Sequence, residues 1–436
     1  MTATAWPRLA RAAAATALCA FAACRSNPAA AKGPYGDKVA DDVPKIEKAT
    51  GLKFKTPPHL EIRSRQQVRE FLLQTVNEPD VQKELDHDAV AYRLLGMIPD
   101  TLHMRDLYVR LLTEQIIGYY DPKTKVLYVV DGAPEEYVGE TILHELVHAL
   151  QDQYANLDSL EHIKGDDDRE AAIEATIEGE ATFWQIYLSM GWQGNVPAQL
   201  PGGWDQIRSQ IADARKTQPV LSSAPMVIQE SLLFPYINGS DFVKRFVARH
   251  PHVSPLTALP QSTEQVIHDA AYFGAKPDLP SIITLPPVNG EIDQNDLGEF
   301  GTRLFFYQHL GESATLSPDS VLAAAQAPTI RAAAGWDADR YALIQSPAGN
   351  EIAWVTVWDS PVDAAEFTST IDDVMMHWRN VRPQVNGTVR KYDDGKRTVQ
   401  ITSRTISGRA VVLYVDVPSG SSTDILDLSK VQVTAR

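Results

Sequence analysis

One stretch of the sequence determines the predicted fold and chemistry: Glu140-Thr141-Ile142-Leu143-His144-Glu145-Leu146-Val147-His148-Ala149-Leu150-Gln151-Asp152-Gln153. A proline and two glutamates at 134–136 suit a first helical turn, and the apolar residues that follow keep helical spacing. Side chains four residues apart lie one above the other on a helix, so His144 and His148 face one point with the Glu145 carboxylate beside them. This spacing predicts a zinc site with a general base. The alternative, a buried helix with two incidental histidines, would leave buried polar groups without partners.

The first residues of the chain have the composition of an export signal. Residues 1–23 combine basic side chains with an alanine-rich apolar run that is too short to span a membrane comfortably. Phe21-Ala22-Ala23-Cys24 resembles the bacterial lipoprotein cleavage box, which implies a lipid on Cys24 that anchors the mature chain in the cell envelope, on the periplasmic side if the cell is Gram-negative. Simple secretion is the alternative. Cys19 and Cys24 are the only cysteines, so after cleavage a metal site must use histidine and carboxylate ligands.

The chain is acidic. Its 56 Asp and Glu residues outnumber its 40 Lys and Arg residues, and the formal net charge is −16. Removal of residues 1–23, which hold two arginines and no acid, takes this charge to −18. Such a surface argues against nucleic acid and against an anionic membrane face as partners, and it favours proteins or peptides.

Four segments are expected along the chain: a signal peptide over 1–23, a tether with a short helix over 24–50, a mainly helical domain over 51–285, and a C-terminal α+β domain over 291–436. In the mainly helical domain, Ser64 is a candidate N-cap. Residues 118–130 have two β-rich arms around an Asp-Pro turn, which predicts a hairpin. An exposed edge of that hairpin could hold an extended peptide beside the metal helix.

Two histidines leave a catalytic zinc ion one protein ligand short. A helix predicted over 168–190 offers several acids, of which Glu170, Glu174 and Glu178 are four residues apart and share a face. The spacing alone leaves the choice among them open. The run Asp166-Asp167-Asp168 precedes this helix and predicts an N-cap in preference to a calcium site.

Several stretches together resemble a little-characterised family of bacterial zinc-peptidase-like lipoproteins: Gly118-Tyr119-Tyr120-Asp121-Pro122, His144 to Gln153, Glu178-Gly179-Glu180-Ala181-Thr182 and Pro260-Gln261-Ser262-Thr263-Glu264-Gln265. The histidine motif followed by a helix with Glu178-Gly179 is also similar to the gluzincin metallopeptidases. These resemblances imply a zincin-like fold, a bound Zn²⁺ and peptide-bond hydrolysis. They imply Glu178 as the third zinc ligand, with Glu174 in reserve. The spacing from His148 to Glu178 exceeds that of thermolysin-like enzymes, so the connection between the two helices must differ.

Other residues are candidates for the surroundings of the metal. Asp152 could orient a ligand imidazole through its second nitrogen, or it could be a solvated helix residue. The related family implies four further residues that line the cleft: Tyr236, Glu264, Gln265 and His268. A tyrosine or histidine there would donate a hydrogen bond to the transition-state oxygen. For these four residues, structural packing or an N-cap at Ser262-Thr263 is the alternative.

The C-terminal segment predicts a small antiparallel sheet with one or two helices. Helices are expected over 297–309 and 362–378, and strands over 351–358, 397–404 and 409–417. The tryptophans at 336, 354 and 358 favour a core over a ligand platform, because aromatic side chains bury a large apolar area. No function is indicated for this segment.

We therefore expect an α+β protein whose mainly helical domain carries a small sheet or hairpin before the metal helix. The expected activity is peptide-bond hydrolysis by zinc-activated water, with His144, His148 and Glu178 as ligands and Glu145 as general base. One alternative is a lipoprotein that keeps the zinc fold for peptide binding or envelope assembly without turnover. Another is a structural envelope protein in which the motif only stabilises a pair of helices.

Overall fold

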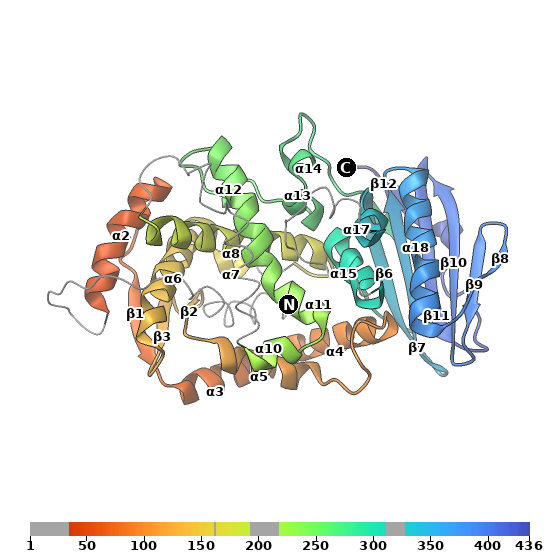
Figure 1. Cartoon of the computed structure of the whole chain (residues 1–436), viewed down its shortest axis with the longest axis horizontal. Helices are drawn as coiled ribbons and strands as arrows, with labels where there is room; N and C mark the ends of the chain where they lie inside the picture. Colours follow the sequence, from red (N-terminus) through yellow and green to blue (C-terminus); the bar gives the residue numbers. More distant parts are fainter. Residues whose placement is uncertain (1–34, 161–162, 192–217, 311–327) are drawn as a thin grey trace.

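In the N-terminal half of the molecule, helices pack against a small three-stranded sheet (Figure 1). The computed structural model describes residues 35–160, 163–191, 218–310 and 328–436, and the statements below concern those residues. The elements that precede the metal helix are α2 (Gly36–Thr50), β1 (His59–Arg63), α3 (Arg65–Val76), α4 (Pro79–Leu94), α5 (Met104–Gln115), β2 (Gly118–Asp121) and β3 (Val126–Val130). Ser64 caps α3 in a capping box with Gln67, which confirms the predicted N-cap.

The small sheet has the order β1-β3-β2, with β1 parallel and β2 antiparallel to β3. Strands β2 and β3 form the predicted hairpin, with Tyr119 opposite Tyr128. In its turn, Asp121 Oδ1 accepts a hydrogen bond from the Lys123 N–H at 2.9 Å. β2 lies at one edge of the sheet, but all four of its residues are buried. The edge is therefore not an open surface for a peptide.

Two long helices follow the hairpin in the chain, and the first packs against both the sheet and the second helix. The first is α6 (Glu135–Ala155), which carries the histidine motif, and the second is α8 (Asp167–Ser189); the short helix α7 (Leu157–Leu160) lies between them in the chain. Asp166 caps α8 by accepting a hydrogen bond from the Arg169 N–H at 3.2 Å, which confirms the predicted cap. Both helices are buried over most of their length.

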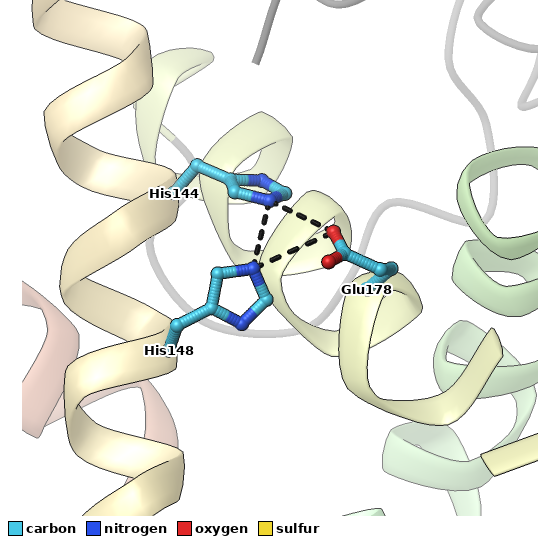
Figure 2. A group of neighbouring side chains, drawn as sticks. All are labelled: His144, His148 and Glu178. Atoms are coloured by element: carbon cyan, nitrogen blue, oxygen red, sulfur yellow. Dashed lines mark hydrogen bonds and ion pairs between the residues drawn. The ribbon is translucent and has the colours of Figure 1, made fainter. Parts of the chain in front are cut away.

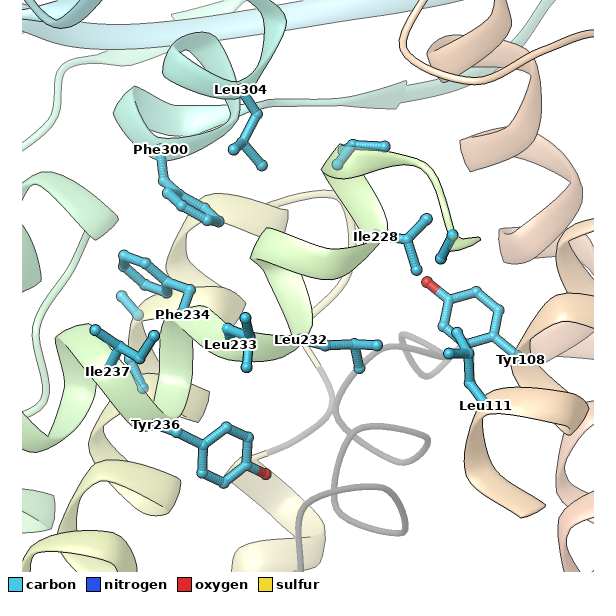
Figure 3. Packing of buried hydrophobic residues seen from close by; sticks show 14 of the residues in the cluster. Tyr108, Leu111, Ile228, Leu232, Leu233, Phe234, Tyr236, Ile237, Phe300 and Leu304 are labelled. Atoms are coloured by element: carbon cyan, nitrogen blue, oxygen red, sulfur yellow. The ribbon is translucent and has the colours of Figure 1, made fainter. Parts of the chain in front are cut away.

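A long helical segment packs across α8. It consists of α11 (Met226–Phe234), the π-helical turn η3 (Pro235–Gly239) and α12 (Ser240–Arg249), and it follows α10 (Pro219–Ser223). Its apolar side chains lie between α5 and α15, and Phe234 stacks on Phe300 with ring centroids 4.1 Å apart (Figure 3). The elements η4 (Pro255–Thr257), α13 (Thr263–Ile267) and α14 (Asp269–Phe273) follow, with Ser262 as the N-cap of α13.

The C-terminal half is an antiparallel sheet of the order β5-β6-β7-β11-β10-β9-β8. Its strands are β5 (Glu291–Asn295), β6 (Trp336–Ser346), β7 (Gly349–Trp358), β8 (Gln384–Asn386), β9 (Val389–Asp393), β10 (Arg397–Ile406) and β11 (Arg409–Pro418). The helices α15 (Gly298–Leu310), α17 (Pro328–Ala333) and α18 (Pro361–Arg379) lie on one side of the sheet (Figure 1). These elements confirm the individual helices and strands that were predicted, but the sheet has seven strands and is larger than predicted. The molecule is α+β.

Both faces of this sheet are buried along its central strands β6, β7 and β11. Trp354 and Trp358 are fully buried and Trp336 is 2% exposed, so the tryptophans belong to the core, as predicted. The opposite face packs against a ribbon in which β4 (Ile282–Thr284) pairs with β12 (Gln432–Thr434), close to the 3₁₀ turn η5 (Leu428–Lys430). Because β4 comes before the expected boundary at 285–291, the C-terminal unit begins earlier than predicted, within the last residues assigned to the mainly helical domain.

The N-terminal end of α8 is attached to the C-terminal sheet. The Asp167 N–H donates to Asn295 Oδ1 at 3.1 Å, and the Asp168 N–H donates to Asp296 Oδ1 at 2.8 Å. Arg340 of β6 donates to the Gly165 carbonyl at 2.8 Å. One helix therefore contacts the sheet at its start and the histidine motif further along.

Candidate metal centre

Three side chains from two helices converge on one point (Figure 2). His144 and His148 project from α6, and Glu178 faces them from α8. The two Nε2 atoms are 3.0 Å apart, and Glu178 Oε2 lies 3.1 Å from His144 Nε2 and 3.4 Å from His148 Nε2. Ligand atoms about 2.0–2.1 Å from a tetrahedral zinc ion would be roughly 3.3 Å from one another. Two imidazole nitrogens and one carboxylate oxygen at this spacing fit a zinc ion.

Of the acids considered on α8, Glu178 is the one that lies with the histidines. It is completely buried, and although burial raises its pKa, the imidazoles of His148 and His144 hold that pKa well below its usual value. Glu174, one turn earlier, instead lines a mainly apolar pocket together with Phe234 and Phe300. The geometry therefore favours Glu178 over the reserve candidate.

Two glutamines hold the imidazole rings. His144 Nδ1 lies 3.1 Å from Gln185 Oε1, and His148 Nδ1 lies 2.8 Å from Gln151 Oε1. The Gln151 amide nitrogen donates to the Ile177 carbonyl and to the Glu180 carboxylate, both at 2.9 Å, so its oxygen must face the histidine. An acceptor at Nδ1 places the proton there and leaves the Nε2 lone pair free to bind a metal ion. Neither glutamine was predicted from the sequence. The feature that could have indicated them is that Gln151 and Gln185 lie on the same two helices as His144, His148 and Glu178.

Asp152 does not make the expected contact with an imidazole. Its carboxylate accepts hydrogen bonds from the Tyr120 hydroxyl and from Lys125 Nζ, each at 2.7 Å, and from the Leu157 N–H at 3.0 Å. It is also buried, so it is not a solvated helix residue either. Its role in the structure is to join β2 and the hairpin turn to the end of α6.

Glu145 lies between the two histidines in the sequence and is 1% exposed. Its Oε2 accepts a hydrogen bond from the Tyr120 N–H of β2 at 2.8 Å. Its Oε1 is buried and has no hydrogen-bond partner in the described part of the chain. Burial raises the pKa of Glu145, against the opposing effect of His148 and His144. The strand therefore fixes one carboxylate oxygen, and no hydrogen bond in the described chain satisfies the other.

The structure separates the remaining candidates for the cleft. Tyr236 of η3 is buried, and its ring centroid lies 6.4 Å from that of His144. Burial and then the carboxylates of Glu178 and Glu174 raise the pKa of Tyr236 well above its usual value. His268 is instead 2.9 Å from Glu299 of α15, and it is not part of the group formed by the three ligands.

The glycine after Glu178 permits close helix packing. A Cβ on Gly179 would lie only 2.8 Å from the Gly239 Cα, and a Cβ on Gly239 would meet the backbone of Ala175. Helix α8 and the π-helical turn therefore touch through their backbones at the level of the ligand. This contact brings the Tyr236 segment next to the metal group.

Comparisons with known proteins concern the other half of the molecule. Residues 284–427 match a family described as "Domain of unknown function (DUF8575)". No curated protein and no solved structure matches the chain. The family match covers the antiparallel sheet and does not include His144, His148 or Glu178.

Proposed function

We propose that this chain is a zinc-dependent peptidase in which Glu145 acts as general base. The observation that carries the proposal is the convergence of three ligand atoms 3.0–3.4 Å apart beside a buried carboxylate with one oxygen unpaired in the described chain. The fold would then be zincin-like, with the third ligand on a second helix. A purely structural metal site has no use for a base at this position.

The reaction would divide between the metal and the side chains around it. A zinc ion held by His144, His148 and Glu178 would supply Lewis-acid chemistry, polarising the peptide carbonyl and acidifying a water molecule. Glu145 Oε1 would accept the proton of the attacking water and deliver it to the leaving amine. The Tyr120 N–H would hold the other oxygen of Glu145 and so fix the direction of proton transfer.

A donor for the developing oxyanion is available from Tyr236. Tyr236 belongs to the π-helical turn that contacts α8 next to Glu178. A phenol O–H can donate to the tetrahedral oxygen, and a buried donor is more effective than one in water. In this proposal, Tyr236 is the transition-state donor, and His268 has no part in the reaction.

The substrate is proposed to be a peptide or protein. The mainly apolar pocket along α8, lined by Glu174, Phe234 and Phe300, offers space for an apolar side chain beside the ligand helix. The proposed location is the cell envelope, with an N-terminal lipid at Cys24, a residue outside the described part of the chain. None of the described helices has the length and hydropathy needed to cross a membrane.

A peptide-library digest tests the proposal. Zinc-loaded protein should cleave peptides, and a chelator should stop cleavage until zinc is restored. Glu145→Gln should keep one zinc ion and the wild-type fold while its rate falls at least about a hundredfold. Glu136→Gln, an exposed position on the same helix, is the matched control and should remain active. Peptide binding without cleavage by the zinc-loaded wild type would contradict the proposal and favour a catalytically silent peptide-binding protein.

A further inference from the structure

Three carboxylates meet where the helical part of the molecule joins the C-terminal sheet. Glu264 belongs to α13, Asp278 lies in the segment after α14, and Asp359 is the residue that directly follows β7. One oxygen of each lies within 4.8 Å of an oxygen of the other two. Asp359 lies inside the matched range 284–427, and the other two acids precede it. The cluster therefore joins two parts of the chain.

The buried member of this cluster has no counter-charge. Glu264 is 6% exposed, and in the described part of the chain its carboxylate has no hydrogen bond and no salt bridge. Nearby cations are bound elsewhere, because Arg303 pairs with Glu299 and Arg409 pairs with Asp337. Burial and then the surrounding carboxylates raise the pKa of Glu264 to about 10. A buried anion in this environment needs a cation or a retained proton.

The backbone holds the two exposed acids in place. The Asp278 N–H donates to the Ala271 carbonyl at 2.8 Å, and the Asp278 carbonyl accepts from the side chain of Gln265. The Asp359 N–H donates to the Gly335 carbonyl at 2.9 Å. The three carboxylates can therefore meet a ligand without rearrangement of the chain, which lowers the entropic cost of binding.

We propose that Glu264, Asp278 and Asp359 bind a calcium ion that joins the helical part to the C-terminal sheet. Carboxylate oxygens without imidazole or thiolate are the ligands of a hard cation rather than of zinc. Asp278 and Asp359 are exposed, so water can complete the six to eight oxygen ligands that calcium prefers. The proposal does not depend on peptide hydrolysis.

Calorimetry on zinc-loaded full-length protein in calcium-free buffer tests this site, with calcium chloride as the titrant. We expect one calcium ion per chain, with a Kd of about 10⁻⁴–10⁻³ M, as in other solvent-accessible extracellular sites. Saturating calcium should also raise Tm by a few degrees, since it binds only the folded chain. Zinc content should stay unchanged throughout.

Two variants and one control assign the ligands. Asp359→Asn and Glu264→Gln should each lower calcium affinity at least about tenfold and lose the calcium-dependent rise in Tm. Asp424→Asn, an exposed acid elsewhere on the C-terminal unit, should behave as the wild type. Since Asp359 is exposed, its variant should fold even if the buried variant does not. Calcium binding that survives Asp359→Asn, or no binding by the wild type, would overturn the proposal.

Discussion

At His148, one ring nitrogen faces the metal group and the other is fixed by Gln151. We expect Gln151→Leu to weaken zinc binding about 10–100-fold, because the ring loses its acceptor and the Glu180 carboxylate loses a donor. Competition with a chromophoric chelator measures the affinity. Gln153→Leu is the control, since this side chain on the same helix bonds the backbone of Lys55 and Thr56 at the surface. Equal affinities for the two variants would show that Gln151 does not support the ligand.

The choice between two glutamates one helical turn apart can be tested by metal content. Glu178→Ala should lose stoichiometric zinc, because two histidines alone remain, whereas Glu174→Ala should keep it. Atomic emission on dialysed protein gives the zinc-to-protein ratio, and circular dichroism checks that both variants fold. Full zinc in the first variant together with loss in the second would move the ligand to Glu174.

The three motif residues could be predicted because one helical period suffices to bring them together. Spacing could not show which acid of the second helix faces the histidines. The choice of Glu178 came from the resemblance to known families. Gln151 and Gln185 escaped prediction, because a glutamine on a helix has no characteristic spacing relative to the imidazole that it holds. For Asp152 the sequence left open a contact with an imidazole or a solvated position, and the structure shows neither, because Asp152 is buried against Tyr120 and Lys125.

At the level of helices, Gly179 and Gly239 allow α8 and the π-helical turn to pack with their backbones in contact. Gly179→Ala should destabilise the protein by about 1–3 kcal/mol and weaken zinc binding, because a methyl group would push α8 away from the backbone of Gly239. Urea unfolding and chelator competition give the two numbers. Gly139→Ala on α6 is the control, since its new methyl would meet only the end of the Lys38 side chain at 3.3 Å. Equal stability of both variants would argue against the backbone contact.

The π-helical turn was not predictable from the sequence. The apolar pattern around Leu232 to Phe246 predicts a helical stretch, and α11, η3 and α12 do form one. However, Pro235 has no N–H to donate, and the turn widens around it, which changes the direction of Tyr236 relative to a regular helix. A proline inside a helix indicates an irregularity but not its form.

Because of His309 in α15, the free energy of unfolding should depend on pH. Its Nε2 donates to the Leu95 carbonyl at the end of α4, at 2.8 Å. Burial, followed by the nearby charges of Arg379 and His377, lowers its pKa to about 4 in spite of this hydrogen bond. The unfolded chain has a histidine pKa of about 6.5, so the unfolded state binds the proton more tightly. The contribution of neutral His309 to the free energy of unfolding is therefore complete above pH 6.5 and is lost as the pH falls toward 4.

This effect can be separated from other titrations. When the pH is lowered from 7 to 5, the low pKa of His309 should reduce the free energy of unfolding by about 2 kcal/mol. His309→Gln keeps a donor for Leu95 but cannot titrate, so its stability should fall by about that much less over the same interval. Urea unfolding of both proteins at the two pH values gives the difference, and the effect of His144 and His148 cancels because they occur in both proteins. Parallel losses in the two proteins would contradict this account.

For the whole molecule, the α+β class and most elements followed from periodicity and capping. Helix α3 begins after Ser64, and strands β7, β10 and β11 occur where alternation predicted them. The pairing of β4 with β12 could not be foreseen, because it joins segments about 150 residues apart with only three residues each. Local patterns specify an element, whereas its neighbours depend on long-range packing.

Helix α8 makes hydrogen bonds in both halves of the molecule. Its first turn bonds Asn295 and Asp296 at the sheet, and its middle presents Glu178 to the histidines. An ion that binds only the folded helix would therefore add to the cooperativity of the entire chain. Scanning calorimetry should show a single transition that moves to lower temperature when zinc is removed. A sheet that melts separately, at a temperature independent of zinc, would mean that α8 transmits no free energy between the two halves.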